Sequence, residues 1–367
     1  MYSLFTSSDV FQTISDIRIY KSRIKYMERL FEKYENKNFG DTLLNEAHQI
    51  FNNQMSHICA CGSFLTFQTL ESDNTVGRLS NGSFCRQRVC PLCQRRKSLK
   101  LYSNMLQILE PIKNKNAFLH LTLTVPNVPL WEMPSEITKI FNSSKALFNS
   151  ERIKKSFKGV IRSLEVTYNK RTKELHPHLH CLVVVNKSYF TSRNYIKFEE
   201  LRKIWGNIIG VASPEISIRK CTSLEDCVRE TVKYAAKPID LEAKNLDGFT
   251  DDEAIMYYMS VAYSLRNRRL IQCFGICAEL SKAFHIDLNN DEEEPILPEY
   301  TQPLYFTYEH ETNNFLSDPF RYGTESDIKE HMTNSEHFNN MYKKLDERKR
   351  EIIRFKAEWA LKHMPKK

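Results

Sequence analysis

Apolar positions recur at helical spacing in the first part of the chain. Residues 17–34 (IRIYKSRIKYMERLFEKY) and 42–51 (TLLNEAHQIF) place apolar side chains three and four positions apart, which is the spacing of one helix face. We therefore expect residues 1–56 to form a helical N-terminal arm.

Between residues 116 and 285, apolar runs of the β type alternate with helical patterns. The strand-like runs are FLHLTLTV (118–125), VIRSLEVTY (160–168) and HLHCLVVV (178–185), which are rich in branched and aromatic residues. A helical pattern follows over residues 221–240. This order predicts an α+β fold, with a central antiparallel sheet in a domain that spans residues 101–285.

The last part of the chain changes character. Residues 287–303 (DLNNDEEEPILPEYTQP) combine an acidic run with three prolines, so we expect a linker over residues 286–305. Residues 340–363 (NMYKKLDERKREIIRFKAEWALKH) have the pattern of one charged amphipathic helix. We therefore expect residues 306–367 to be a helical tail.

Composition indicates a folded protein. The 367 residues are 41% hydrophobic and 27% charged, with only 10 glycines and 13 prolines, which excludes a collagen or a low-complexity polymer. No stretch approaches 18 uncharged apolar residues and the N-terminus lacks a signal-peptide pattern, so we expect a cytoplasmic protein with no membrane partner. The net charge is +8 overall but +13 over residues 1–286, which points to a polyanion such as nucleic acid.

Five of the ten cysteines lie within residues 57–100, a segment that we interpret as zinc-binding. In a reducing compartment clustered cysteines hold metal more often than they form disulfides, although burial as small hydrophobes is the alternative. Zinc requires four soft ligands in a tetrahedron. We assign these ligands to Cys61, Cys85, Cys90 and Cys93, with Cys59 and His57 as alternative candidates.

Basic side chains surround this cluster, and we expect them to contact DNA phosphates, since arginine engages phosphate with two parallel hydrogen bonds. The alternative is a solvated rim. The candidates are Arg86, Arg88, Arg95, Arg96 and Lys97.

Three histidines alternate along one predicted strand, in HPHLH (176–180). Alternate residues of a strand share a face, and neighbours on that face can reach one ion. We choose His178 and His180 as metal ligands, because His176 precedes a proline at the start of the strand. The alternative is that these histidines are ordinary polar side chains at the surface of a strand edge.

Hairpin geometry supplies a third ligand. Residues 169–173 (NKRTK) form a polar turn, and placing its centre between Arg171 and Thr172 sets Glu165 directly opposite His178. A slip of one residue in this register would remove the ligand. Two imidazoles and a carboxylate with open positions suit a divalent metal that also binds substrate oxygens.

The helix predicted over residues 224–237 carries further candidate chemistry. Ser223 and Asp226 match a capping box before it, and Pro238 stops it. Glu230, Tyr234 and Lys237 are spaced by four and three residues, so they share one face. Tyrosine can attack phosphorus, lysine can neutralise phosphate, and glutamate can accept a proton. An ordinary helix with surface pairs is the alternative.

In this order, FLHLTLTVPN, LEVTYN with HPHLHCLVVV, and ETVKYAAK resemble the motifs of plasmid rolling-circle replication initiators of the HUH endonuclease class. FCRQRVCPLCQRRKS (84–98) is similar to the cysteine-rich segment that precedes their catalytic domain. The resemblance covers residues 57–285, and it implies that residues 101–285 are the catalytic nuclease domain. It implies an antiparallel sheet with helices on one side and the histidines on a central strand.

The resemblance also implies the roles of individual residues. His178 and His180 match the metal-binding pair, and Tyr234 matches the nucleophile that cuts one DNA strand through a 5′-phosphotyrosine, leaving a 3′-hydroxyl primer. Glu230 matches the carboxylate that activates water to end a replication round, and Lys237 matches the lysine of the Y-x-x-K pattern. The implied cofactors are Mg²⁺ or Mn²⁺ for catalysis and structural Zn²⁺.

The implied partners are plasmid origin DNA, single-stranded or extruded as a hairpin at the nick site, together with a host helicase and a DNA polymerase. A homodimer formed through the C-terminal helix stays open. Two alternative functions also stay open: a single-tyrosine HUH transposase, and a non-catalytic zinc-dependent DNA-binding regulator.

Overall fold

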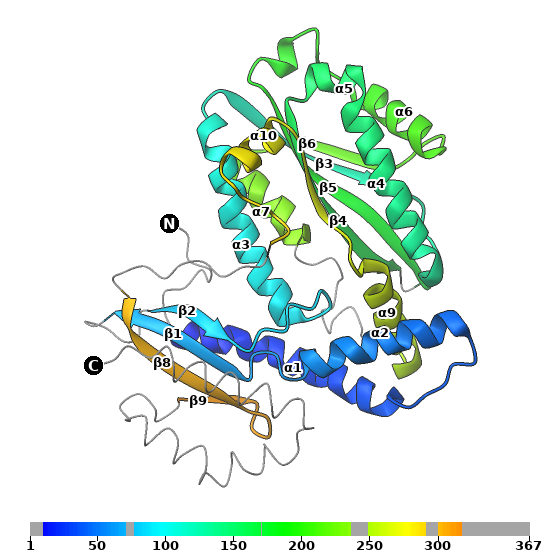
Figure 1. Ribbon diagram of the computed structural model, residues 1–367. Coiled ribbons are helices and arrows are strands. Elements are labelled where there is room, and N and C mark those ends of the chain that lie inside the picture. The colour runs from blue at the N-terminus through cyan, green and yellow to red at the C-terminus, as the bar shows by residue number, and fades with distance from the viewer. Residues whose placement is uncertain (1–9, 71–76, 170, 236–248, 291–299, 318–367) are drawn as a thin grey trace.

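The computed structural model describes residues 10–70, 77–169, 171–235, 249–290 and 300–317 of the chain. These residues form two antiparallel sheets with helices around them, so the predicted α+β class is confirmed (Figure 1). The helix predicted at residues 340–363 lies outside the described residues, as does Lys237. No helix in the described ranges is both long enough and apolar enough to cross a membrane.

The N-terminal arm is helical, as predicted. It consists of α1 (Val10–Tyr34) and α2 (Thr42–Ile58), which contact each other and α9 (Asp251–Leu265). The carboxylate of Asp41 begins α2 by accepting a hydrogen bond from the Leu44 amide at 2.9 Å, as is typical of an N-cap. Lys33 of α1 donates to the Asp251 carboxylate at 2.7 Å, so the arm is tied to the start of α9.

The larger sheet has five strands in the order β6-β3-β5-β4-β7. Their bounds are β3 (Asn116–Thr124), β4 (Gly159–Asn169), β5 (Glu174–Asn186), β6 (Ile216–Lys220) and β7 (Ile271–Gly275). β4 and β5 form the predicted hairpin, in which the side chain of Asn169 accepts from the Arg171 amide at 3.0 Å. The histidine-bearing strand β5 therefore lies in the middle of the sheet, as expected.

Helices cover both faces of this sheet, which corrects the expectation of helices on one side. Leu182 and Val184 pack with α3, α7 and α10 on the histidine face, and Leu179 and Val183 pack with α4, α6 and α9 on the other. The reason is that residues 179–185 are buried on both faces, and such a strand needs apolar cover on each side. The bounds are α3 (Pro91–Leu109), α4 (Met133–Asn149), α5 (Glu151–Ser156), α6 (Phe198–Ile209), α7 (Leu224–Ala235) and α10 (Ile276–Ala283), with short 3₁₀ helices η1 (Glu110–Ile112), η2 (Leu130–Glu132) and η3 (Tyr189–Thr191).

The second sheet joins segments that are far apart in sequence. Its order is β2-β1-β8-β9, from β1 (Phe64–Leu70), β2 (Gly77–Gly82), β8 (Tyr300–Glu309) and β9 (Asn314–Ser317). We expected helix from residue 306 onward, and this was wrong for the residues that form β8 and β9. β8 also begins inside the predicted linker. The alternation of Leu304, Phe306 and Tyr308 has a period of two, which favours a strand.

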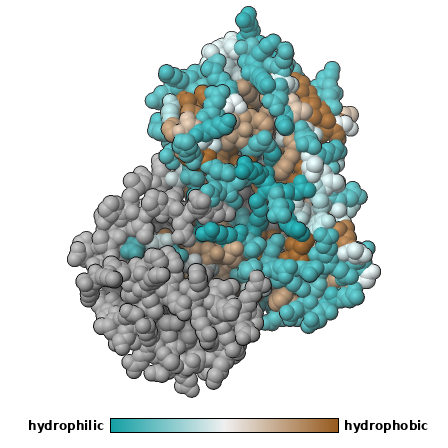
Figure 2. Space-filling model, in the orientation of Figure 1, coloured by the Kyte–Doolittle hydropathy of each residue, from teal (hydrophilic) through white to brown (hydrophobic). Residues whose placement is uncertain are grey.

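The surface of the described residues is mostly hydrophilic. Figure 2 shows separate hydrophobic patches on the upper part of this view, which holds the five-stranded sheet and its helices. Six large hydrophobic side chains are exposed among the described residues: Ile19, Leu43, Phe190, Tyr195, Phe198 and Phe284.

Candidate metal centres and catalytic helix

The predicted register of the β4–β5 hairpin is confirmed. Glu165 on β4 lies directly opposite His178 on β5, and Ser163 lies opposite His180. Because opposite residues share a face, the carboxylate and both imidazoles project to the same side of the sheet. The turn at residues 169–173 fixes this register, because its length sets which residues oppose each other.

The three side chains meet at one oxygen. Oε2 of Glu165 lies 2.6 Å from Nε2 of His178 and 2.7 Å from Nε2 of His180. The residues are buried, with exposed fractions of 7% for Glu165, 9% for His178 and 5% for His180. At these distances the carboxylate oxygen either accepts hydrogen bonds from the imidazoles or shares a cation with them.

Burial and hydrogen bonding oppose each other here. Burial alone would raise the pKa of Glu165, but hydrogen bonds from His178 and His180 outweigh it and hold that pKa below its ordinary value. Burial lowers the pKa of His180, although Glu165 partly offsets this effect. The cluster therefore favours an ionised carboxylate beside a neutral His180 imidazole, the protonation states that ligate metals.

The donor set fits a divalent metal. Nδ1 of His178 lies 3.2 Å from the carbonyl oxygen of His176. A proton on Nδ1, donated to that oxygen, would leave Nε2 free to ligate a metal ion. One donor atom from each of Glu165, His178 and His180 lies within 4.8 Å of the others. The three residues could hold one ion and leave further positions open.

The helix α7 crosses the same face of the sheet. It contacts β3, β4 and β5, and Leu224, Val228 and Val232 form its buried stripe. The Ser223 hydroxyl accepts from the Asp226 amide at 3.1 Å at the start of the helix. α7 thus lies over the cluster of Glu165, His178 and His180.

α7 carries two of the predicted catalytic residues. Glu230 lies near enough to His180 for its charge to raise the pKa of that imidazole against the larger effect of burial. An Arg219 nitrogen lies 3.8 Å from Oε2 of Glu230. Tyr234 stands one turn further along α7, and its side chain lies outside the described part of the structure.

Two residues near the cluster escaped the sequence analysis. The rings of His120 on β3 and His180 have centroids 5.3 Å apart, and burial together with the charge of His180 lowers the pKa of His120 to about 4. Arg219 on β6 lies opposite His120. The available signal was the alternation in FLHLTLT, which places His120 and Thr122 on one face.

The cysteine cluster forms a second candidate metal centre. The Cys61–Cys93, Cys61–Cys90 and Cys85–Cys93 sulfur pairs lie 3.5, 3.5 and 3.7 Å apart. Four thiolates around one zinc ion, each about 2.3 Å from the metal, lie about 3.8 Å from one another. The four side chains predicted as ligands therefore fit a tetrahedral zinc site, and Cys59 lies outside this group.

The surroundings favour negative charge on one of these sulfurs, that of Cys61, whereas the hydrogen bond with Cys61 raises the pKa of Cys85 and burial raises the pKa of Cys90. Hydrogen bonds from Cys85, Cys90 and Cys93 outweigh burial and lower the pKa of Cys61, and the Arg86 amide donates to Sγ of Cys93 at 3.2 Å. Lys21 of α1, only 2% exposed, donates to the Cys61 carbonyl oxygen at 2.7 Å. This buried amine, which no local sequence pattern reveals, lies beside the thiols. Burial lowers the pKa of Lys21, and the nearby Cys61 and Cys90 sulfurs partly offset this effect.

The basic residues near the cysteines do not form one uniform exposed face. Arg88 donates to the carbonyl oxygen of Arg268 at 2.5 Å, and the guanidinium of Arg96 stacks 3.5 Å from the centre of the Phe84 ring. Arg86 is exposed, whereas Arg95 and Lys97 are half-buried on α3. Arg88 and Arg96 thus make contacts within the protein.

Comparison with known proteins identifies a family. A family model described as "Replication protein" matches residues 76–313. This range contains Glu165, His178, His180 and α7, together with three of the four clustered cysteines.

Individual relatives carry related names. A "Protein rep" of Streptococcus pneumoniae serotype 2 is 37% identical over 195 residues, which are 50% of this chain and 60% of the relative. A "Protein rep" of Staphylococcus aureus is 32% identical over 224 residues, 59% of this chain and 91% of the relative. One from Bacillus amyloliquefaciens is 31% identical over 274 residues, 66% of this chain and 78% of the relative. No solved structure gives a significant match.

Proposed function

Because this chain belongs to the replication-protein family, we propose that it initiates rolling-circle replication of a plasmid by cutting one DNA strand at the origin. The cut is a transesterification through Tyr234, and the enzyme later rejoins the strand. The observation that carries the proposal is the convergence of Glu165, His178 and His180 under α7, the helix that bears Glu230 and Tyr234.

The chemistry follows from these groups. The phenolic oxygen of Tyr234 attacks the scissile phosphorus, a new bond forms between this oxygen and phosphorus, and the bond from phosphorus to the 3′-oxygen breaks. The phenol loses its proton and the leaving oxygen gains one, so the products are a 5′-phosphotyrosine and a free 3′-hydroxyl. The energy of the phosphodiester stays in the tyrosine linkage, so rejoining needs no ATP.

Each of the remaining residues has an assigned role. Glu165, His178 and His180 hold Mg²⁺ or Mn²⁺, which when bound polarises the scissile phosphate and stabilises charge on its oxygens. Glu230 accepts a proton from the water that ends a replication round, and Lys237 neutralises phosphate charge. A zinc ion held by Cys61, Cys85, Cys90 and Cys93 stabilises the fold beside α3.

Binding to the origin brings further residues and partners into the proposal. We assign phosphate contacts to Arg86, Arg95 and Lys97, with Arg88 and Arg96 shaping the same region from their contacts within the protein. The catalytic domain spans residues 101–285. A host helicase and a DNA polymerase act on the nicked product in the cytoplasm.

The testing experiment uses supercoiled DNA that carries the region beside the protein's own gene. The wild type, Tyr234→Phe and the control Tyr263→Phe on α9 are incubated with and without added Mn²⁺, and nicks and covalent protein–DNA adducts are scored. We expect metal-dependent nicks and adducts with the wild type and the control, and neither with Tyr234→Phe. DNA binding without an adduct in any metal would favour a non-catalytic regulator instead.

A further inference from the structure

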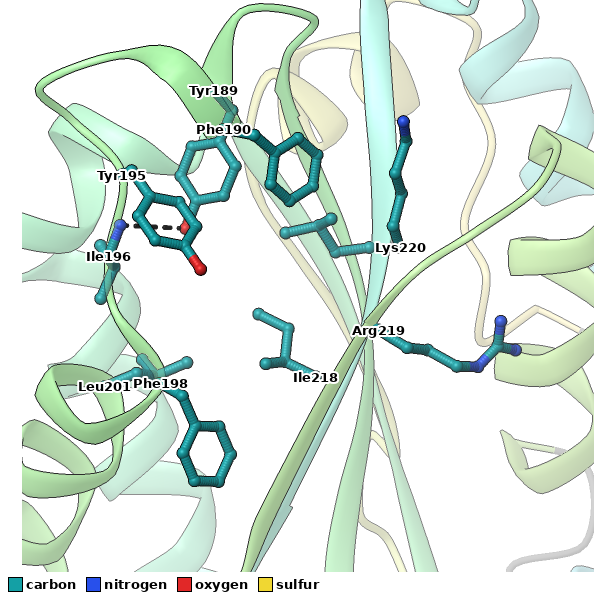
Figure 3. Close-up of a pocket in the computed structure, with 10 residues that line it drawn as sticks. Tyr189, Phe190, Tyr195, Ile196, Phe198, Leu201, Ile218, Arg219 and Lys220 are labelled. Atoms are coloured by element: carbon teal, nitrogen blue, oxygen red, sulfur yellow. Dashed lines mark hydrogen bonds between the residues drawn. The ribbon is translucent and has the colours of Figure 1, made fainter.

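A hollow lined by aromatic side chains lies at the edge of the five-stranded sheet. It is a shallow surface hollow between strands β3 and β6 and the segment that leads into α6. Three of its side chains, Phe190, Tyr195 and Phe198, are exposed by 42%, 41% and 41%. Half of the exposed large hydrophobic side chains in the described residues therefore gather in one place, as Figure 3 shows.

The aromatic side chains stand on a rigid frame. Arg152 of α5 donates to the carbonyl oxygen of Tyr195 at 2.9 Å and to the Glu200 carboxylate at 2.6 Å. The Tyr189 hydroxyl accepts a hydrogen bond from the Ile196 amide at 3.2 Å, and its ring contacts the rings of Phe190 and Tyr195. The exposed rings of Phe190 and Tyr195 are thus held in place before any ligand binds, which reduces the entropy cost of binding.

Basic residues accompany the aromatic ones along the segment that leads into α6, and Arg219 and Lys220 line the hollow from β6. Residues 187–197 (KSYFTSRNYIK) contain three basic residues and no acidic residue, and all three basic side chains are exposed. The Lys220 ammonium lies 5.4 Å from the centre of the Phe190 ring. Aromatic faces interleaved with cations are typical of surfaces that bind single-stranded nucleic acid, whose bases stack while its phosphates meet basic groups.

The hollow and the metal cluster are connected through β6. This strand lies at one end of its sheet in the described structure, and Lys220 and Arg219, as successive residues, project from opposite faces. Figure 3 shows Arg219 extending away from the aromatic side chains, and it lies opposite His120, whose ring is near His180. A strand of DNA that crosses the edge of β6 can therefore reach both faces.

We propose that this hollow binds unpaired bases of single-stranded DNA that flank the cleavage site, by stacking on Phe190, Tyr195 and Phe198. The proposal rests on the proposed function, because it supplies the grip that keeps one origin strand unpaired. The occupant is single-stranded DNA and not duplex, since paired bases stack inside the helix and offer no face to these rings.

The test measures binding of a fluorescein-labelled oligothymidylate of about 20 nucleotides without added divalent metal, when no strand is cut. Phe190→Ala and Tyr195→Ala should each weaken binding at least fivefold, since stacking on one aromatic side chain contributes that much or more. Phe190→Tyr and Tyr195→Phe should bind like the wild type. Phe284→Ala removes an exposed aromatic side chain outside the hollow and should also leave affinity unchanged.

Two further readouts separate stacking from a structural effect. An abasic oligonucleotide of equal length should bind the wild type and Phe190→Ala equally, because it has no base to stack. An oligonucleotide with 5-iodouracil should cross-link, on irradiation, to the peptide that contains Tyr195. Unchanged oligothymidylate affinity in Phe190→Ala and Tyr195→Ala would overturn the proposal and leave the surface to a protein partner.

The nicking assay distinguishes the two proposals. Loss of oligothymidylate binding in the alanine variants, together with a wild type that never nicks, would retain the hollow and reject the proposed function. If the wild type nicks normally and the alanine variants bind oligothymidylate as tightly as the wild type, the proposal of DNA binding at the hollow is rejected and the proposed function is kept.

Discussion

Glu165 and His178 face each other across strands β4 and β5, with Oε2 of the carboxylate 2.6 Å from Nε2 of the imidazole. The same oxygen lies 2.7 Å from Nε2 of His180. One carboxylate therefore organises both histidines, and its charge determines how strongly the cluster attracts a cation.

Replacing this carboxylate should weaken metal binding. In Glu165→Gln the side chain keeps its shape but loses its charge. The Mn²⁺ concentration for half-maximal nicking should therefore rise by about tenfold to a hundredfold or more. Loss of a residue that only supports a metal ligand already weakens metal binding by that factor. The control Glu151→Gln changes a carboxylate whose side chain is 92% exposed. Equal metal requirements in wild type and Glu165→Gln would remove Glu165 from the ligand set.

Glu230 should matter for ending the reaction and not for starting it. Glu230→Gln removes a general base, which contributes about 10²- to 10⁴-fold to a proton-transfer step. We therefore expect normal formation of the covalent adduct but slow hydrolysis, so that adducts accumulate. The measurement follows adduct formed and released with a labelled oligonucleotide, and a variant that fails to form the adduct would place Glu230 in the first step.

The cysteine cluster should bind one zinc ion. Cys85→Ser should lose this ion and lower the melting temperature by about 5 °C or more, because binding energy at a structural zinc site is folding energy. Cys59→Ser is the matched control, since Cys59 lies outside the cluster. Zinc content is measured by atomic emission, and retention of zinc by Cys85→Ser would require a different ligand.

His120 should make the folded state sensitive to acid. Its pKa is lowered from 6.5 to about 4, so its stabilising contribution is present above pH 6.5 and is lost as the pH falls toward 4. The loss amounts to at most about 3 kcal/mol. Urea unfolding of wild type and His120→Gln at pH 7.5 and 5, with zinc present, should show a smaller pH dependence in the variant. Equal pH dependence would show that His120 is solvated.

Contacts between residues close in the sequence could be predicted from the sequence, whereas contacts between distant residues could not. The turn at residues 169–173 determines that Glu165 lies opposite His178, so this pair followed from counting residues. Lys21 and Cys61 are 40 positions apart, and no local periodicity connects them. His120 was overlooked because a histidine within an apolar run has no neighbour that marks its role until the strands pair.

Helix placement shows the same limit. Apolar residues on both faces of β5 require cover on both sides. The sequence patterns of α4 and α6 do not predict the face of the sheet on which these helices pack. Tertiary packing decides this, and the expected arrangement with helices on one side was wrong for that reason.

The pairing of β1 with β8 places Leu65 opposite Phe306, and this has a consequence for synthesis on the ribosome. At about 5–20 residues per second, β1 emerges on the order of 10–50 s before its partner strand. During that interval one edge of β1 has only solvent or other chains to pair with, and unpaired edges promote aggregation. A chain that stops before residue 300 would keep that edge exposed.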